Sequence, residues 1–176
     1  AATPALFRET NNPKTAVVVP SVSSERREYV PMGFIDDQTI ATNLVLLVPD
    51  GTLYHFGVLT SSVHMAWMRV VCGRLEMRYR YSAAIVYNNF PWPEGADEAS
   101  ITGTAQAILD VRARYPDASL ADLYDPLTMP PDLRAAHRVN DKAVLAAYGL
   151  RPDTPEPEIV ARLFRLYAAK TGEGAG

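Results

Sequence analysis

The sequence predicts an α+β fold, in which a small mixed β-sheet module with a buried helix (residues 1–93) precedes a helical module (residues 94–176). Two observations support this prediction. Up to Pro93, short apolar or alternating runs typical of strands are separated by turn residues. Beyond Pro93, the composition shifts to Ala, Leu, Arg and Asp, and signals for the start and end of helices follow one another. A chain of 176 residues that is 48% hydrophobic can bury a core, as one domain or as two small ones.

The first module should begin with several extended segments. They are expected at residues 15–20, 27–34 and 40–49, and at residues 52–56 after a turn at Asp50-Gly51. Pro20 ends the first segment, and Pro31 places the second at a sheet edge or a bulge, because proline cannot donate to a strand ladder. Residues 1–12 show no clear period and are interpreted as the cut end of a longer protein.

A buried helix should follow the extended segments. Residues 60–62 are Thr-Ser-Ser, whose hydroxyls can cap a helix start, and Gly73 stands where a left-handed residue would end the helix. Between these signals, residues 63–71 are apolar nearly all round, as expected for a helix that is buried on most sides.

The second module should consist of helices. They are expected at residues 98–115 with a weak spot at Thr102-Gly103, in a short turn after a capping box at Ser119, at residues 131–149, and from Thr154-Pro155 onward. Glu156 and Glu158 would favour the positive end of the last helix.

Residues 73–82 alternate strictly between apolar and polar side chains. Leu75, Met77, Tyr79 and Tyr81 occupy one parity, and Glu76, Arg78, Arg80 and Ser82 occupy the other. Because successive side chains of a strand point to opposite faces, the pattern predicts one strand, continuing to about Tyr87, with an acid and two arginines above an apolar underside. Such a row can contact base edges in a DNA major groove, since Arg can donate to G O6 and N7 and Glu can accept from C N4. A solvated sheet face with cross-strand ion pairs is the commoner origin of such a pattern, because edge strands often carry charge.

The distribution of charge indicates weak affinity of this module alone for DNA. The net charge is −3, with +1 in residues 1–93 and −4 in residues 94–176. The basic concentration consists of four arginines set against Glu76, namely Arg69, Arg74, Arg78 and Arg80. Because phosphate attraction supplies most non-specific affinity for DNA, a parent enzyme would have to supply further positive surface.

Cysteine content and hydropathy bound the location of the protein. Cys72 is the single cysteine, which excludes an internal disulfide and favours a reducing compartment, so a cytoplasmic location is expected. No apolar run approaches the length of a membrane span, so no membrane partner is expected.

No catalytic residue and no metal site are expected in this sequence. It lacks the glycine-rich cofactor turn and the Asn/Asp-Pro-Pro-aromatic motif of an adenine methyltransferase, and residues 88–91 (NNFP) are interpreted as a turn with Phe90 and Trp92 packed as anchors. None of the three lysines lies near an acidic pair with the spacing of a nuclease site. The residues Cys72, His55, His64 and His137 show no ligand spacing for a metal.

One alternative is a small self-contained hydrolase that uses Ser61 or Ser62 with His64. Serines at the start of a helix are more often caps than nucleophiles, and no G-x-S-x-G elbow is present. The serines are therefore interpreted as caps, and His64 as a core or interface histidine.

Two long segments resemble a known family. Residues 56–93 (FGVLTSSVHMAWMRVVCGRLEMRYRYSAAIVYNNFPWP) resemble the target recognition domain of MmeI-type (type IIL/IIG) fused restriction–modification enzymes. These enzymes join a nuclease, a class I S-adenosylmethionine-dependent DNA adenine methyltransferase and a DNA-reading domain. Residues 119–149 (SLADLYDPLTMPPDLRAAHRVNDKAVLAAYG) resemble the helical segment that closes them.

The resemblance implies a sequence-specific DNA recognition module. Its partners would be double-stranded DNA and the methyltransferase domain of the same parent chain. It would hold no cofactor itself, whereas S-adenosylmethionine and Mg would belong to the parent enzyme.

The resemblance also implies base-reading residues. Glu76 and Arg78 match a position pair at which members carry either an acid-x-Arg or a Lys-x-Asp pair, which implies a C on the strand with the methylated adenine and a G opposite. Arg80 would contact a neighbouring base pair, together with an upstream segment that aligns with Asn43 and Leu44. Use of Asn43 as a cap or turn residue is the open alternative.

Contacts with the DNA backbone are expected from Arg26, Arg27, Arg69 and Arg74, the first two in a contact loop at residues 21–27. The acidic helical module is expected to act as a scaffold, although Arg134, Arg138 and Lys142 share a spacing of four and could touch phosphate instead of forming a solvated face. A different class of function is also open, that of a protein-interaction or scaffold module of a phage-defence DNA methyltransferase.

Overall fold

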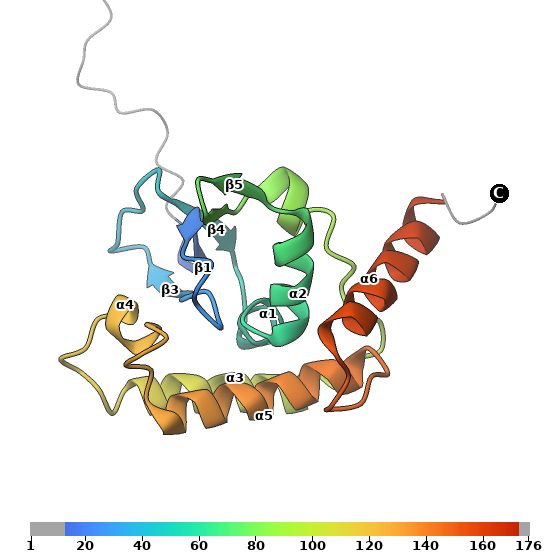
Figure 1. Cartoon of the computed structure of the whole chain (residues 1–176). Coiled ribbons are helices and arrows are strands. Elements are labelled where there is room, and N and C mark those ends of the chain that lie inside the picture. Colours follow the sequence, from blue (N-terminus) through green and yellow to red (C-terminus); the bar gives the residue numbers. More distant parts are fainter. Residues whose placement is uncertain (1–12, 173–176) are drawn as a thin grey trace, which may run out of the picture.

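The computed structural model describes residues 13–172 and confirms the predicted α+β class. The strands lie on one side of the molecule, and the long helices α3 (Glu98–Arg112) and α5 (Pro131–Ala147) lie side by side beneath them (Figure 1). Helix α6 (Glu156–Thr171) follows α5 and packs against α2 (Ser62–Val71). Residues 1–12, interpreted above as the cut end of a longer protein, lie outside the described residues.

Within residues 13–172, the strands form two antiparallel sheets of three strands each. The first sheet has the order β3 (Gly33–Asp36), β1 (Thr15–Pro20), β4 (Val45–Pro49), and the second has the order β2 (Val22–Ser23), β6 (Arg78–Arg80), β5 (Gly73–Leu75). The strand predicted at residues 15–20 is confirmed as the central strand of the first sheet, where Val17 and Val19 are buried. The next two extended segments are shorter than predicted, because only their last residues or those just beyond pair with β1.

The extended segment predicted at residues 52–56 is wrong, because these residues begin helix α1 (Leu53–Leu59). Thr52 precedes the helix and donates its backbone N–H to His55 Nδ1 at 3.1 Å, which orders the first turn. The second half of α1 is buried against α3. Periodicity cannot separate a buried strand from a buried helix over so few apolar residues, which explains the error.

Helix α2 is confirmed, and it starts as predicted. Ser61 Oγ accepts a hydrogen bond from the backbone N–H of His64 at 3.3 Å, and most of the helix is buried. Its end differs from the prediction, because Gly73 does not adopt the left-handed conformation. The chain instead passes through an extended Cys72 directly into β5.

The helices of the second module are also present. Helix α3 runs through Thr102-Gly103 without a break and ends at Arg112. The capping box at Ser119 is confirmed at the start of α4 (Leu120–Leu123), where the Ser119 N–H donates to Asp122 Oδ2 at 3.0 Å. Helix α5 is followed by Gly149, whose φ of 68° is the left-handed conformation expected of its stop.

A buried polar junction joins α1 to α3 and α5. Asn140 is fully buried, and its Nδ2 donates to the Gly57 carbonyl oxygen at 2.8 Å while its Oδ1 accepts from Thr104 Oγ1 at 2.9 Å. Gly57 permits this close approach, since an added Cβ would lie 2.8 Å from Ile101 Cγ2. The hydrophobic core is continuous across this junction and contains residues from both halves of the chain.

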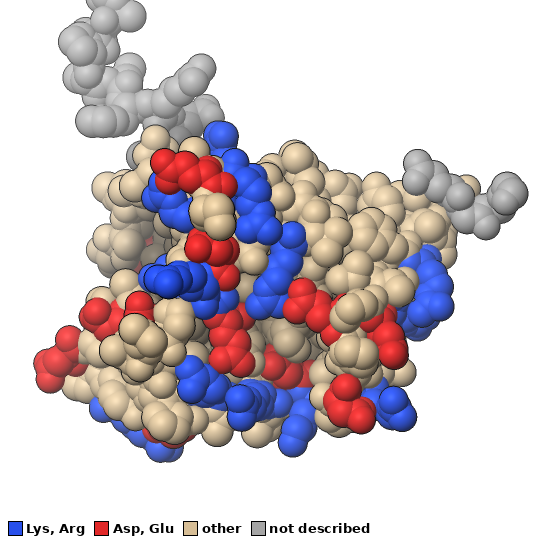
Figure 2. All heavy atoms as spheres, in the orientation of Figure 1, with Lys and Arg blue, Asp and Glu red and all other residues tan. Residues whose placement is uncertain are grey.

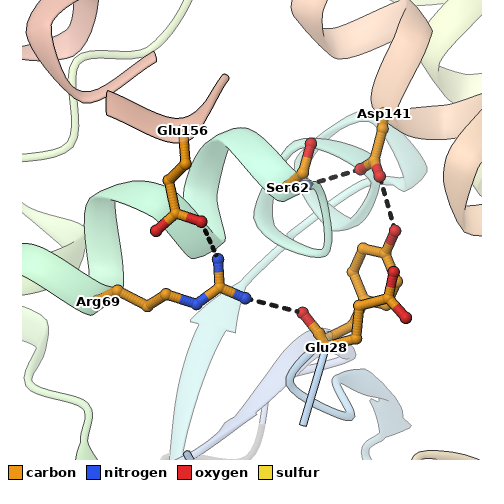
Figure 3. Close-up of polar contacts among 6 residues, drawn as sticks. Glu28, Ser62, Arg69, Asp141 and Glu156 are labelled. Atoms are coloured by element: carbon orange, nitrogen blue, oxygen red, sulfur yellow. Dashed lines mark hydrogen bonds and ion pairs between the residues drawn. The ribbon is translucent and has the colours of Figure 1, made fainter. Parts of the chain in front are cut away.

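A second polar cluster holds the loop before β3 against α2, α5 and α6 (Figure 3). Asp141 on α5 accepts from the Ser62 N–H at 2.6 Å, which satisfies a free amide at the start of α2, and from the Tyr29 hydroxyl at 2.7 Å. Arg69 on α2 pairs with Glu156 at 2.7 Å and donates to the Glu28 carbonyl oxygen at 3.3 Å. Residues 13–93 and the helical residues 94–172 therefore pack as one structural unit.

Two buried histidines should make the fold sensitive to acid. Burial lowers the pKa of His64 to about 3, and burial together with Arg112 lowers that of His137 to about 3. Between pH 6.5 and 3 the unfolded chain would bind two protons that the folded chain does not. Each histidine should therefore remove about 1.4 kcal/mol of unfolding free energy for every pH unit below about 6.5. Asp141 acts in the opposite direction, because burial raises its pKa.

Urea unfolding of the chain at pH 7, 6 and 5 measures this effect. We expect the free energy of unfolding to decrease toward pH 5, and the decrease to be about half as steep in His64→Gln, which retains one of the two histidines. An unfolding free energy that does not change between pH 7 and 5 would contradict the assignment of both histidines as neutral.

Candidate nucleic-acid interface

Residues 73–80 form a β-hairpin, so the prediction of a single continuous strand is wrong. Leu75 in β5 pairs with Arg78 in β6, and Gly73 pairs with Arg80. The two intervening residues, Glu76 and Met77, form the turn, and Glu76 has a φ of 57°. In a hairpin with a two-residue turn, directly paired residues share a face, so Leu75 lies on the face of Arg78 and the parity changes at the turn. The unbroken alternation of apolar and polar residues therefore favoured one strand over the hairpin.

The tip of this hairpin presents Glu76 and Arg78 to solvent. Their side chains are 77% and 49% exposed, and Arg78 Nη2 lies 2.9 Å from Glu76 Oε2. They come from the turn and from the strand that leaves it, and not from one row on a strand face as predicted. The resulting arrangement places a carboxylate and a guanidinium side by side at the exposed turn of the hairpin, where both can exchange their mutual contact for another partner.

Of the four apolar side chains predicted to share one buried face, only two are buried. Tyr79 and Tyr81 are buried, at 6% and 5% exposure, and they fix the base of the hairpin to the core. Leu75 is 42% exposed, because it pairs with Arg78 and lies on the same face as Arg78 and Arg80, and Met77 is 71% exposed in the turn. The hairpin is therefore anchored at one end and open to solvent at the other.

Arg80 lies in the central strand of the second sheet, between Gly73 and Val22. Gly73 has no side chain to cover it, and the Arg80 side chain has no ion-pair partner among residues 13–172. It lines an open groove of about 530 Å³. The other residues that line this groove include Ser21, Asn43, Ser82 and Ile85.

The structure brings Asn43 and Leu44 to the same place as Arg80. Ser21, which immediately precedes β2, donates both its N–H, at 3.0 Å, and its Oγ, at 2.7 Å, to the Leu44 carbonyl oxygen. The Ser21 carbonyl oxygen in turn accepts from the Tyr81 N–H at 2.9 Å, next to Arg80. Both Asn43 and Leu44 are exposed, so the upstream segment and the hairpin form one surface.

The four arginines predicted to contact the DNA backbone differ in what they contact. Arg26 and Arg27 line an open groove of about 330 Å³ beside residues 125–127 and have no ion-pair partner among the described residues. Arg74 stacks on the Tyr79 ring at 4.2 Å and donates to the Met77 carbonyl oxygen in the turn. Arg69 is paired with Glu156, so its guanidinium contributes to the fold, and its role at phosphate stays a prediction.

The charge on this side of the molecule is mixed rather than uniformly basic. Figure 2 shows Lys and Arg side chains gathered in the upper part of the view, around the position of β5 in Figure 1, with Asp and Glu side chains between them. A surface of this kind attracts phosphate only moderately, but it offers hydrogen-bond donors and acceptors of both kinds close together.

Ser61, which caps α2, has structural partners, and Ser62 donates its backbone N–H to Asp141 Oδ1. Ser61 is fully buried, and its Oγ donates to the Val58 carbonyl oxygen at 2.7 Å while it caps α2. His64 is also fully buried, with Nε2 2.9 Å from the Tyr81 hydroxyl, so its interpretation as a core histidine is confirmed. Ser61 and His64 therefore support the fold in this arrangement and present no nucleophile to a cavity.

Residues 88–91 also support the fold, as predicted. Phe90 is 4% exposed and packs edge-on against His64, with ring centroids 4.5 Å apart. The Asn89 amide donates to the carbonyl oxygens of Ala84 and Ile85 at 2.9 and 3.1 Å. Phe90 therefore packs as an anchor in the core, and the Asn89 amide is engaged by the backbone of residues 84 and 85.

Two further properties hold for the part of the chain that the structure describes. Among residues 13–172, no three His, Cys, Asp or Glu side chains lie where they could hold a metal ion. Over the same residues, every helix is too short or too polar to cross a membrane.

The sequence patterns did not predict the element that closes one side of the groove. Residues 83–87 were expected to continue the strand, but they form a π-helix, η1 (Ala83–Tyr87). Ser82 stands at the N-cap of η1 but makes no side-chain cap hydrogen bond, and the Ile, Val and Tyr that follow favour strands. Ile85 consequently had no signal as a groove residue, whereas Ser21 lay in the predicted contact loop and Ser82 on the predicted polar face.

Comparison with known families accounts for nearly the whole chain. Residues 1–94 match the family described as "MmeI, target recognition domain", and residues 94–173 match "MmeI, C-terminal domain".

Two known proteins are similar to the chain over most of its length. It is 41% identical over 174 residues to DNA methyltransferase A of Bacillus subtilis (strain 168), covering 97% of this chain and 20% of that protein. A structure of the Type IIL restriction-modification enzyme MmeI in complex with DNA matches with a TM-score of 0.88 and 42% identity, covering 94% of this chain and 22% of that one. The chain thus spans about a fifth of the length of these relatives.

Proposed function

The chain belongs to the MmeI family, in which it corresponds to the target recognition domain followed by the C-terminal domain, and from this we propose that it selects the DNA site of a larger adenine methyltransferase. The observation that carries this proposal is the hairpin tip with Glu76 and Arg78 next to the groove that holds Arg80 and Asn43. We refer to Glu76, Arg78, Arg80, Asn43 and Leu44 as the recognition surface.

The hairpin fits the major groove of B-DNA, which admits a two-stranded β-ribbon. In the proposed complex, Glu76 accepts a hydrogen bond from C N4 and Arg78 donates to O6 and N7 of the paired G. The two side chains contact each other in the free protein, at 2.9 Å. An exposed ion pair of this kind contributes only about 0–1 kcal/mol, so exchanging it for base contacts costs little.

The groove beside the hairpin would extend the recognition to neighbouring base pairs. Arg80 is unpaired within residues 13–172 and can donate to a purine N7, and Asn43 can make the bidentate contact that suits adenine. Because Ser21 holds the Leu44 carbonyl oxygen with two hydrogen bonds, the position of the Asn43 segment relative to the hairpin is set before DNA binds.

The rest of the parent enzyme would supply catalysis. S-adenosylmethionine would bind to its methyltransferase domain, and the residues of this chain would position the DNA without touching the cofactor. We assign residues 1–93 to DNA recognition and residues 94–176 to a scaffold that fixes the recognition domain, since α3 and α5 carry its buried junctions. A cytoplasmic location follows from this function.

Arg26 and Arg27 provide a test of the proposed DNA backbone contacts. Replacing both with Gln in the intact parent enzyme should reduce the slope of log K against log salt concentration by about 2, because each phosphate contact contributes about 0.9. The methylated sequence should not change, since phosphate contacts carry no sequence information. The measurement is DNA binding at several salt concentrations, with Arg114→Gln/Arg151→Gln as the control, because these two exposed arginines lie on the helical half. If the variant with Gln at positions 26 and 27 kept the wild-type salt dependence, Arg26 and Arg27 would not contact the DNA backbone.

A further inference from the structure

The π-helix η1 forms one wall of the groove that holds Arg80. Ser82, Ala83 and Ile85 line the groove on this side, and Asn43 lines it with Arg80. The groove therefore combines hydrogen-bonding side chains with an apolar wall. The apolar wall has no role in the readout described so far, which uses charged and amide groups alone.

The backbone of η1 is held in place from its buried side. Trp67 Nε1 donates to the Val86 carbonyl oxygen at 2.9 Å, and Val86 itself is fully buried. On the other side, the Asn89 amide donates to two carbonyl oxygens of η1, those of Ala84 and Ile85. The π-helix is thus a braced element.

This bracing holds an apolar side chain in water. Ile85 is 50% exposed, and Ala83 beside it is exposed as well, although Val86 next to them is completely buried. A single exposed apolar residue needs no explanation, but this one lies in the groove of the proposed base readers. In a DNA major groove, the one apolar group on a base edge is the C5-methyl group of thymine.

We propose that Ile85, supported by Ala83, contacts the C5-methyl group of a thymine in the base pair next to the one that Arg80 contacts. This inference rests on the proposed function, because it needs DNA in the groove. Ile85 adds a specificity-determining residue, since a cytosine at the same position lacks the methyl group and would leave the side chain without an apolar partner. The element that carries Ile85 is rigid before binding, so little conformational freedom is lost in the contact.

The proposal is tested by removing the methyl group from the DNA. Each thymine within and flanking the recognised sequence, on both strands, is replaced in turn by deoxyuridine, and the affinity of the intact parent enzyme is measured for each duplex. We expect one position at which deoxyuridine weakens binding about four-fold, the effect of one buried methyl group at about 0.8 kcal/mol. The variant Ile85→Ala should bind the thymine duplex about four-fold more weakly and should not distinguish thymine from deoxyuridine there.

Val139→Ala provides a matched control, because Val139 is 53% exposed on α5 and does not line the groove. This variant should retain the full difference between thymine and deoxyuridine. If Ile85→Ala weakens binding equally on both duplexes, Ile85 acts through folding or through another domain of the parent, and the proposal is overturned.

The outcome also separates this inference from the proposed function. A wild-type enzyme that is insensitive to every deoxyuridine substitution would overturn the role of Ile85. The DNA-recognition function would still stand if variants of the hairpin tip continued to change the methylated sequence.

Discussion

Exchanging Glu76→Lys together with Arg78→Asp should change one C·G pair of the recognised sequence to G·C, and no other position. Lys at the turn can donate to G O6 and N7, and Asp in the strand can accept from C N4 of the paired base, so the swap reverses the donor and acceptor pattern. Each contact should contribute about 1–3 kcal/mol of discrimination between the two base pairs, which is roughly 5- to 150-fold. The position of the turn should be retained, because the pairing of β5 and β6 does not depend on these two side chains.

The measurement is the methylated motif of the intact parent enzyme, mapped in a host that is free of adenine methylation. Arg151→Asp/Asp153→Arg is the matched control, because these residues have the same spacing, form an exposed ion pair at 3.5 Å and lie on the helical half. The control should leave the motif unchanged. A double hairpin variant that still methylates the original motif would place the readout elsewhere and leave Glu76 and Arg78 as a solvated ion pair.

Gly57→Ala should destabilise the chain by about 1–3 kcal/mol, whereas Gly103→Ala should stabilise it by roughly 0.5–1 kcal/mol. Both glycines lie inside helices, so helix propensity alone would favour alanine at each. At Gly57 the added methyl group would lie 2.8 Å from Ile101 Cγ2 and 3.1 Å from Asn140 Oδ1, and the hydrogen bonds of Asn140 would have to shift. At Gly103 no atom lies within 4 Å of the added methyl group.

Chemical unfolding of the chain and its two glycine variants measures the effect, with the opposite signs as the decisive feature. If both variants gained stability, α1 would not approach α3 as closely as described, and the buried junction at Asn140 would be looser. Equal losses at both positions would indicate instead that helix α3 does not tolerate a side chain where it is exposed.

Local sequence signals predicted an element correctly where the interactions that start or end it lie within its own segment. Helix α2 begins after Ser61, whose hydroxyl accepts from the His64 amide, and both partners of the capping box at Ser119 lie within four residues. Helix α5 ends before Gly149, whose left-handed φ is inexpensive only for glycine. These signals depend on residues within a few positions of one another, so they can be read from the sequence alone.

Local signals failed where the same letters suit two structures. The alternation of residues 73–80 favoured one strand, but these residues form a hairpin whose second strand also pairs with β2, more than fifty residues earlier. Residues 53–59 and 83–87 are apolar runs that became helical because their buried sides face the core, at Phe56 and Val86. Tertiary packing overrides strand propensity in such segments.

For this protein, the sequence by itself determined the α+β class, the capped helices and the identity of the charged residues that we propose to contact DNA. Only the tertiary structure decided that Glu76 and Arg78 lie at a hairpin tip, that Asn43 and Arg80 line one groove, and that Arg69 is paired with Glu156. The physical reason is the range of the interactions. Caps and turns are settled by neighbours in the chain, whereas the groove and the ion pair are settled by packing between segments that are distant in sequence.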